Sequence, residues 1–199
     1  MFRIDHETLQ CISVFLGEPL DISGVVGVGD KDLGKGMAFI FSHKTHSANV
    51  TSRSITFNGA FHHSAPSSTS PSNAYLAVHG WVQGTPWIEY YIVENYATFS
   101  PLSQPGVTYI GSIGVDGSQY DLGVETYVGT PRAPTNAVGA VTIRRLWSVR
   151  VAKRTSGTVT VAAHWIKWAT AGPVGTIHEW QIVLCESLNR NGKCNLTVS

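Results

Sequence analysis

The residues from Ser54 onward form short β-rich runs separated by turn signals, and this spacing most constrains the fold. Each run is rich in Val, Ile, Thr or aromatic residues and has the length of a single strand. The runs span residues 55–61, 75–81, 87–96, 107–115, 119–128, 141–151 and 157–161. Many short strands at this spacing predict an all-β sandwich or jelly roll.

The segments between the runs carry turn signals and one helical pattern. The dipeptides Asn58-Gly59, Asp116-Gly117 and Asn191-Gly192 are of the type that closes β-hairpins. Residues 162–172 instead have apolar residues at helical spacing and end in Gly, with Pro173 behind. We therefore predict one short helix in a chain that is otherwise built of strands.

Length and composition limit the function classes. The chain has 199 residues, a formal net charge of +1 and only 14% charged residues, which predicts one domain and excludes a nucleic-acid-binding surface. The apolar stretch 11–17 is too short to span a bilayer and follows Asp5 and Glu7 rather than a basic segment, so it is a poor signal peptide. Residues 1–33 show no clean strand pattern, and we treat them as a divergent N-terminal segment.

Three cysteines cannot all pair within one chain. Cys185 and Cys194 flank the predicted turn at Asn191-Gly192, so a disulfide across this hairpin is one possibility and free thiols are the other.

Two glutamates suggest chemistry on sugars. In the run 87–96, residues two apart share a face, so Glu89 points the same way as Tyr91 and lies beside Trp87. A carboxylate among aromatic rings suits a sugar-binding cleft, and Glu186 supplies a second carboxylate about a hundred residues later. Retaining sugar hydrolysis needs such a pair, one ionised and one protonated, roughly 5–5.5 Å apart.

Several motifs, in order and spacing, resemble family 11 glycoside hydrolases, which are endo-β-1,4-xylanases. The motifs are residues 75–81, 89–95, 115–121, 147–150 with Lys153-Arg154, the helix with His164 and Trp168, and 181–186. The resemblance covers roughly residues 54–199, and we assign 34–199 to the catalytic domain. It implies a β-jelly roll of two curved antiparallel sheets around a cleft, with one short α-helix and a thumb loop.

The resemblance also implies an activity and its partners. Glu89 would be the nucleophile that forms a covalent xylosyl intermediate, and Glu186 would be the acid/base. The expected substrate is xylan, and we expect neither a cofactor nor a metal ion. We also expect a monomer that acts outside the cell and binds neither membrane nor nucleic acid.

Further cleft positions follow from the same resemblance. Asp30 matches the position that hydrogen-bonds the acid/base, where Asp accompanies an acidic pH optimum. Tyr91 and Trp81 match residues near the nucleophile, although either could serve sandwich packing instead. Pro134 belongs to the predicted thumb, 131–136.

Some cleft positions depart from the family pattern. His79 stands where a Tyr is usual, and Thr130 stands where an Arg is expected, with Arg132 close by. The other substitutions are Arg145 for a Gln, Trp180 for a Tyr and Leu188 for a Tyr. No Trp precedes Trp81, so a sugar-stacking Trp usual in the N-terminal strands is missing.

These departures keep a second hypothesis open. The leading one is a retaining endo-β-1,4-xylanase, and the alternative is a xylanase-like protein that binds cell-wall polysaccharide or acts as an elicitor with little turnover. A carbohydrate-binding module is disfavoured because it needs no paired glutamates. Residues 29–36 nearly spell a phosphate-binding loop but lack its final Ser or Thr, and the eight His lack partners at metal-ligand spacing. Ser-His-Asp catalysis is also disfavoured, because the chain has no nucleophile-elbow sequence.

Overall fold

The computed structural model describes residues 36–42, 53–63, 73–130, 139–175, 177–188 and 192–198, with side chains in 53–62, 73–130, 139–175, 181–186 and 196–198. The strands are β1 (Gly36–Ser42), β2 (Ser54–His63), β3 (Asn73–Gln83), β4 (Trp87–Tyr96), β5 (Thr108–Val115), β6 (Ser118–Gly129), β7 (Val141–Arg150), β8 (Ser156–Thr160), β9 (Ile177–Leu188) and β10 (Gly192–Val198). The helices are the 3-10 turn η2 (Pro101–Ser103) and α1 (Val161–Ala169).

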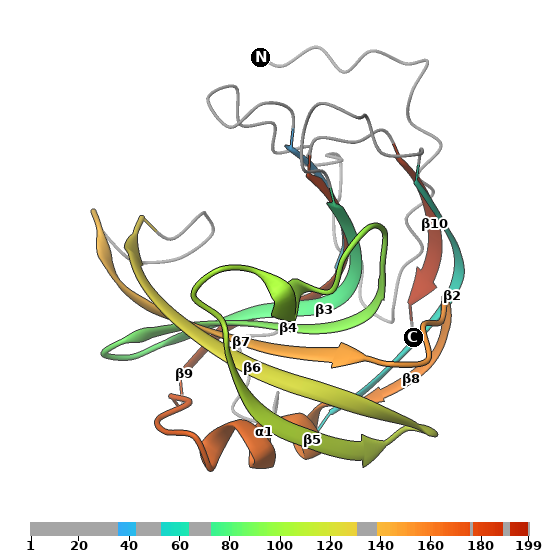
Figure 1. The fold of residues 1–199 in the computed structure, drawn as a ribbon. Helices are drawn as coiled ribbons and strands as arrows, with labels where there is room; N and C mark the ends of the chain where they lie inside the picture. Colours follow the sequence, from blue (N-terminus) through green and yellow to red (C-terminus); the bar gives the residue numbers. More distant parts are fainter. Residues whose placement is uncertain are drawn as a thin grey trace.

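The described strands form two sheets, which confirms the expected all-β fold. The larger sheet has the order β1-β9-β3-β4-β7-β6-β5, and the smaller has the order β10-β2-β8. Figure 1 shows the larger sheet as strongly bent, with α1 on its convex side. Neighbouring strands are antiparallel except for β4 and β7, which run parallel. This exception arises because the chain crosses from β4 to β5 at the sheet edge and then returns through β6 to β7.

Alternating side chains give the larger sheet two different faces. On β4, Ile88 and Tyr90 pack into a core shared with the smaller sheet and α1, whereas Tyr91 and Val93 belong to a cluster on the other face. Glu89 lies on the Tyr91 side, because residues two apart in a strand share a face. The predicted alternation of this run is therefore confirmed, and it directs a carboxylate away from the core.

The predicted helix is confirmed as α1. Its buried residues recur at helical spacing and are Val161, His164, Trp165 and Trp168. The indole nitrogen of Trp168, which is fully buried, donates to the carbonyl oxygen of Trp147 at 3.0 Å and so ties the helix to β7. Gly172 takes a φ of +128°, a conformation that favours glycine and turns the chain away after the helix.

The turn predictions have different outcomes. Asp116-Gly117 joins β5 to β6 with φ values of 50° and 72°, as expected for a tight hairpin turn. The turn expected at Asn58-Gly59 is wrong, because both residues lie inside β2 and pair with β10. Pairing partners from distant parts of the chain override the local turn preference there. The connection before Gly192 and the predicted thumb, 131–136, lie outside the described residues.

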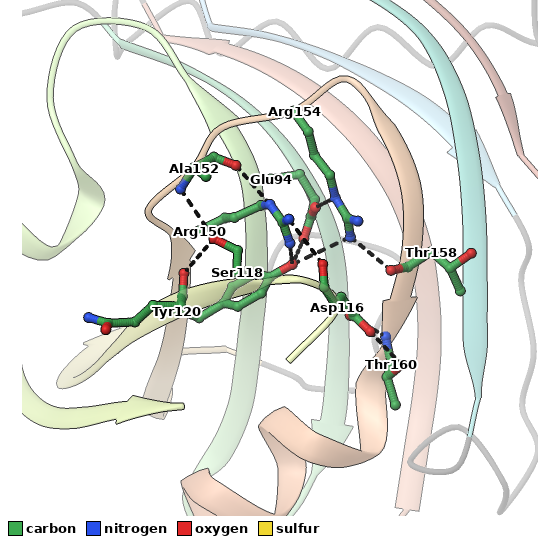
Figure 2. A network of polar contacts seen from close by, with 10 residues as sticks. Glu94, Asp116, Ser118, Tyr120, Arg150, Ala152, Arg154, Thr158 and Thr160 are labelled. Carbon is green, nitrogen blue, oxygen red and sulfur yellow. Dashed lines mark hydrogen bonds and ion pairs between the residues drawn. The ribbon is translucent and has the colours of Figure 1, made fainter. Parts of the chain in front are cut away.

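A polar network joins four strands next to the core. The buried carboxylate of Glu94 on β4 accepts hydrogen bonds from the Tyr120 hydroxyl at 2.7 Å and from Arg154. Arg150 donates to the same Tyr120 hydroxyl at 2.7 Å and to the backbone oxygen of Asp116 at 3.0 Å (Figure 2). Burial raises the pKa of Glu94, and Arg154 opposes that change. The network fixes one end of β4 and leaves its Glu89 end to the cleft.

Candidate active site

A cleft of about 370 Å³ opens on the face of the larger sheet that carries Glu89. Both glutamates singled out by the sequence, Glu89 and Glu186, line it. The aromatic residues in its lining are Tyr75, Trp81, Tyr91, Tyr127 and Trp147. Carboxylates between aromatic rings in a concave site form a suitable surface for binding and cleaving sugars.

Sheet topology places the two glutamates on the strands that flank β3. Glu89 is on β4 and Glu186 is on β9, and β3 lies between these strands. In the register of β3, Trp81 pairs with Glu89 and Tyr75 pairs with Glu186. Burial raises the pKa of Tyr91 well above 10, and the charges of Glu89 and Glu186 raise it further. Both carboxylates therefore act on the Tyr91 hydroxyl.

The Glu89 carboxylate is held by four side chains. Its Oε2 accepts hydrogen bonds from the Arg145 Nε at 2.5 Å and from the Tyr127 hydroxyl at 2.9 Å. Its Oε1 accepts a hydrogen bond from the Tyr91 hydroxyl at 3.1 Å and lies 3.3 Å from the His79 Nε2. Both contacts to Oε2 are therefore shorter than both contacts to Oε1.

These contacts keep Glu89 ionised. Burial acts to raise the pKa of Glu89, but the charge of Arg145 and the hydrogen bond with His79 outweigh it and lower that pKa to about 2. Burial also lowers the pKa of His79, which favours its neutral form. Arg145 is thus the cation that balances the Glu89 charge at neutral pH.

Arg145 also contacts a third carboxylate. Its Nη1 donates to the Glu125 Oε1 at 2.9 Å, and its Nη2 donates to the Tyr127 hydroxyl at 2.7 Å. In the sheet register Arg145 pairs with Glu89 on β4 and with Glu125 on β6, so the three residues form one row across three strands. Cross-strand pairs of this kind bring their side chains into contact.

Stacked rings support the Glu89 partners. The Tyr91 ring lies between the His79 ring at 4.1 Å and the Trp147 ring at 4.6 Å, with interplanar angles of 13° and 21°. Trp81 meets His79 and Trp87 edge to face, at centroid distances of 6.4 and 6.5 Å. Such packing restricts the orientation of the Tyr91 hydroxyl toward Glu89.

Most of the predicted site residues within the described ranges gather in this cleft or at its base. Those that line it are Glu89, Glu186, Trp81, Tyr91, Thr130 and Arg145, and His79 contacts Glu89. For Trp180 and Leu188 the structure describes the backbone, and Trp180 pairs with Trp81. The other predicted positions, Asp30, Arg132 and Pro134, lie outside the described residues.

The sequence reasoning missed several contributors to the cleft. They are Tyr75, Gln104, Glu125, Tyr127 and Trp147. A signal for two of them was present, since Glu125 and Tyr127 are two apart in a run predicted as a strand and so share a face. The guanidinium expected beside the nucleophile comes from Arg145 on β7, whereas Thr130 is exposed.

Cys185 is disulfide-bonded. The side chain of Cys194 lies outside the described residues, so its pairing with Cys185 stays one possibility.

Within the described ranges, the structure groups no three His, Cys, Asp or Glu side chains in a way that could hold a metal ion. The same ranges contain no helix with the length and apolar character needed to cross a membrane.

Comparison with known proteins extends this description. Residues 34–197 match the family described as Glycosyl hydrolases family 11. An "Ethylene-inducing xylanase" of Penicillium digitatum is 40% identical over 152 residues, and an "Endo-1,4-beta-xylanase 2" of Rhizopus oryzae is 39% identical over 152 residues. Each match covers 76% of this chain and 64% of the relative, so the chain spans less than two thirds of their length.

Solved structures share the fold. One of two major endo-1,4-β-xylanases from Trichoderma reesei has a TM-score of 0.68 at 30% identity, covering 83% of this chain and 82% of that one. The family 11 xylanase of Neocallimastix patriciarum has a TM-score of 0.64 at 26% identity, covering 83% of this chain and 76% of that one.

Proposed function

This chain belongs to family 11 of the glycosyl hydrolases, and on that premise we propose that it is a retaining endo-β-1,4-xylanase acting on xylan. The observation that carries the proposal is that Glu89 and Glu186 line one cleft, with Glu89 held ionised. An ionised carboxylate and a second carboxyl group in one cleft are the two groups that a double-displacement reaction uses, which supports the proposal.

In the first step, Glu89 attacks the anomeric carbon of a xylose unit and forms an ester bond. The glycosidic bond breaks, and its electron pair goes to the leaving oxygen, which takes a proton from Glu186. Oε1 is the attacking oxygen, because Arg145 and Tyr127 hold Oε2 at the shorter distances. Oε2 then becomes the carbonyl oxygen of the ester and keeps accepting their hydrogen bonds.

In the second step, water attacks the same anomeric carbon and gives a proton to Glu186. The ester bond breaks, and its electron pair returns to Glu89 as the carboxylate charge. Two displacements at one carbon retain its configuration. The aromatic lining of the cleft supplies apolar faces for the sugar rings.

The test is release of reducing sugar from soluble xylan between about pH 4 and 7, with the wild type, Glu89→Gln and Glu186→Gln. We expect the Glu89 substitution to lower the rate by a factor on the order of 10³ or more. Asp121→Asn removes a carboxylate from the same strand as Tyr127, outside the cleft lining, and is the matched control. Proton NMR of the first product should show the β anomer, and an α anomer would refute a retaining mechanism.

A second candidate is a polysaccharide-binding or elicitor protein with little turnover. The contact that favours it is the ion pair of Arg145 with Glu89, because a carboxylate in an ion pair is a weaker nucleophile than a free one. Folded wild-type protein that binds xylan without releasing sugar would support this candidate and exclude the first.

We further propose that the protein acts outside the cell. The disulfide at Cys185 supports this location, since disulfides persist in oxidising compartments.

A further inference from the structure

Arg145 lies between two carboxylates that differ in their role. Its Nε is 2.5 Å from the Glu89 Oε2, and its Nη1 is 2.9 Å from the Glu125 Oε1. The side chains of Arg145, Glu89 and Glu125 are 23%, 7% and 14% exposed. The three charges are therefore shielded from water, and each depends on the others for compensation.

The proposed reaction changes this balance of charges. In the resting enzyme two carboxylates share one guanidinium, which leaves a net charge of −1. When the Glu89 Oε1 forms the ester bond to the anomeric carbon, the Glu89 charge is lost. The ester carbonyl still accepts a hydrogen bond from Arg145, but it no longer neutralises the cation. Only Glu125 then remains as a charged partner of Arg145 among the contacts that the structure gives.

We propose that Glu125 is a positioning residue for catalysis, the counter-ion that keeps Arg145 paired while the sugar is bound covalently to Glu89. This inference rests on the proposed retaining function and deepens it. Glu125 acts through Arg145 and takes no part in bond making.

The structure holds Glu125 firmly in this role. Its Oε1 also accepts a hydrogen bond from the Trp147 indole nitrogen at 3.1 Å, so the carboxylate is fixed from two sides. The Arg145 guanidinium lies over the Tyr127 ring at 4.6 Å, which restricts its movement toward another partner. Arg145 pairs in register with both glutamates, so the position of its backbone does not depend on the charge of either.

The step that Glu125 assists can be tested with Glu125→Gln, which keeps the shape and an acceptor oxygen but removes the charge. Without the counter-ion, formation of the ester leaves an unpaired cation whose side chain is only 23% exposed. We therefore expect kcat/KM for 4-nitrophenyl β-xylobioside to fall about 30-fold, since this constant reports formation of the intermediate. Asp121→Asn is the matched control, expected within about twofold of the wild type on the same assay.

Trapping of the intermediate gives a second readout. With an activated 2-fluoro xylobioside, mass spectrometry follows the sugar adduct on Glu89. Glu125→Gln should form this adduct about 30-fold more slowly, and Glu125→Asp, which keeps the charge, should recover most of the rate. If Glu125→Gln, which lacks the charge, forms the adduct at the wild-type rate, the inference is overturned.

A double-mutant cycle separates the proposed role from a merely structural one. In an Arg145→Gln background there is no cation to pair, so adding Glu125→Gln should change kcat/KM less than about twofold. The double variant removes both charges of the Arg145–Glu125 pair, so its comparison with Arg145→Gln does not depend on the fold tolerating Glu125→Gln alone. The same loss in both backgrounds would overturn the inference, and a wild type without turnover would overturn the proposed function as well.

Discussion

Replacing Arg145 with Gln should raise the pKa of Glu89 and move the acid limb of the pH–activity profile toward neutral pH. Burial acts to raise that pKa, and the charge of Arg145 is the largest influence that lowers it, from 4.5 to about 2. This difference corresponds to about 3 kcal/mol in favour of the ionised form. Without the cation, the largest influence that lowers the pKa of Glu89 is absent, and we expect a pKa of about 4.5 or above.

The effect on activity follows from the ionised fraction. Glu89 attacks only as a carboxylate. A pKa of about 2 leaves almost every Glu89 ionised at about pH 4, whereas a pKa of about 4.5 leaves about a quarter ionised. The ratio of kcat/KM at about pH 4 to that at about pH 6 should therefore fall at least about fourfold in Arg145→Gln.

The assay is hydrolysis of 4-nitrophenyl β-xylobioside from about pH 3 to 7, with xylobioside well below KM. Taking the ratio within each variant removes any general loss of activity that the substitution causes. Arg145→Lys keeps a cation and is the matched control, so its acid limb should stay close to that of the wild type. The reasoning is refuted if Arg145→Gln has the same pH ratio as the wild type.

Three other substitutions have separate expected outcomes. Tyr127→Phe removes a hydrogen bond to the Glu89 carboxylate, so kcat/KM should fall about tenfold, and an unchanged value would show that this contact is unimportant. Glu94→Gln leaves Arg154 without its buried partner, so urea denaturation should report a free energy of unfolding lower by about 3 kcal/mol. An unchanged free energy of unfolding would show that the network of Figure 2 does not stabilise the fold. Burial lowers the pKa of His164 from 6.5 to about 4, so the unfolded state binds its proton first as pH falls. Stability should therefore drop by about 3 kcal/mol from about pH 6.5 to 4, and His164→Gln should flatten that slope; an equally steep slope in the variant would contradict this assignment.

Much of the fold could be predicted from local patterns. The strand from Trp87 to Tyr96 was predicted with the bounds that the structure gives, because its β-branched and aromatic residues mark its length. The helix α1 was likewise readable from its buried residues at helical spacing. Asn58-Gly59 shows where local reading is wrong, since β10 and β8 pair with β2 on either side and hold it extended.

Pairing between distant strands was not readable from the sequence. The parallel contact of β4 with β7 depends on the path of the chain around the sheet edge, which no local pattern encodes. The same contact places Arg145 beside Glu89. For this reason the sequence reasoning noted Arg145 as a substitution but did not identify it as the nucleophile's ion-pair partner.

The sequence by itself indicated the family, the strands from β2 to β8 and the two glutamates, because these depend on motif order and on the alternation of residues along a strand. Only the tertiary structure decided which side chains surround Glu89. Arg145, Tyr127 and Glu125 come from two strands that the chain reaches long after β4. The physical reason is that burial and charge at Glu89 are set by contacts through space, and these exist only once the sheet has assembled.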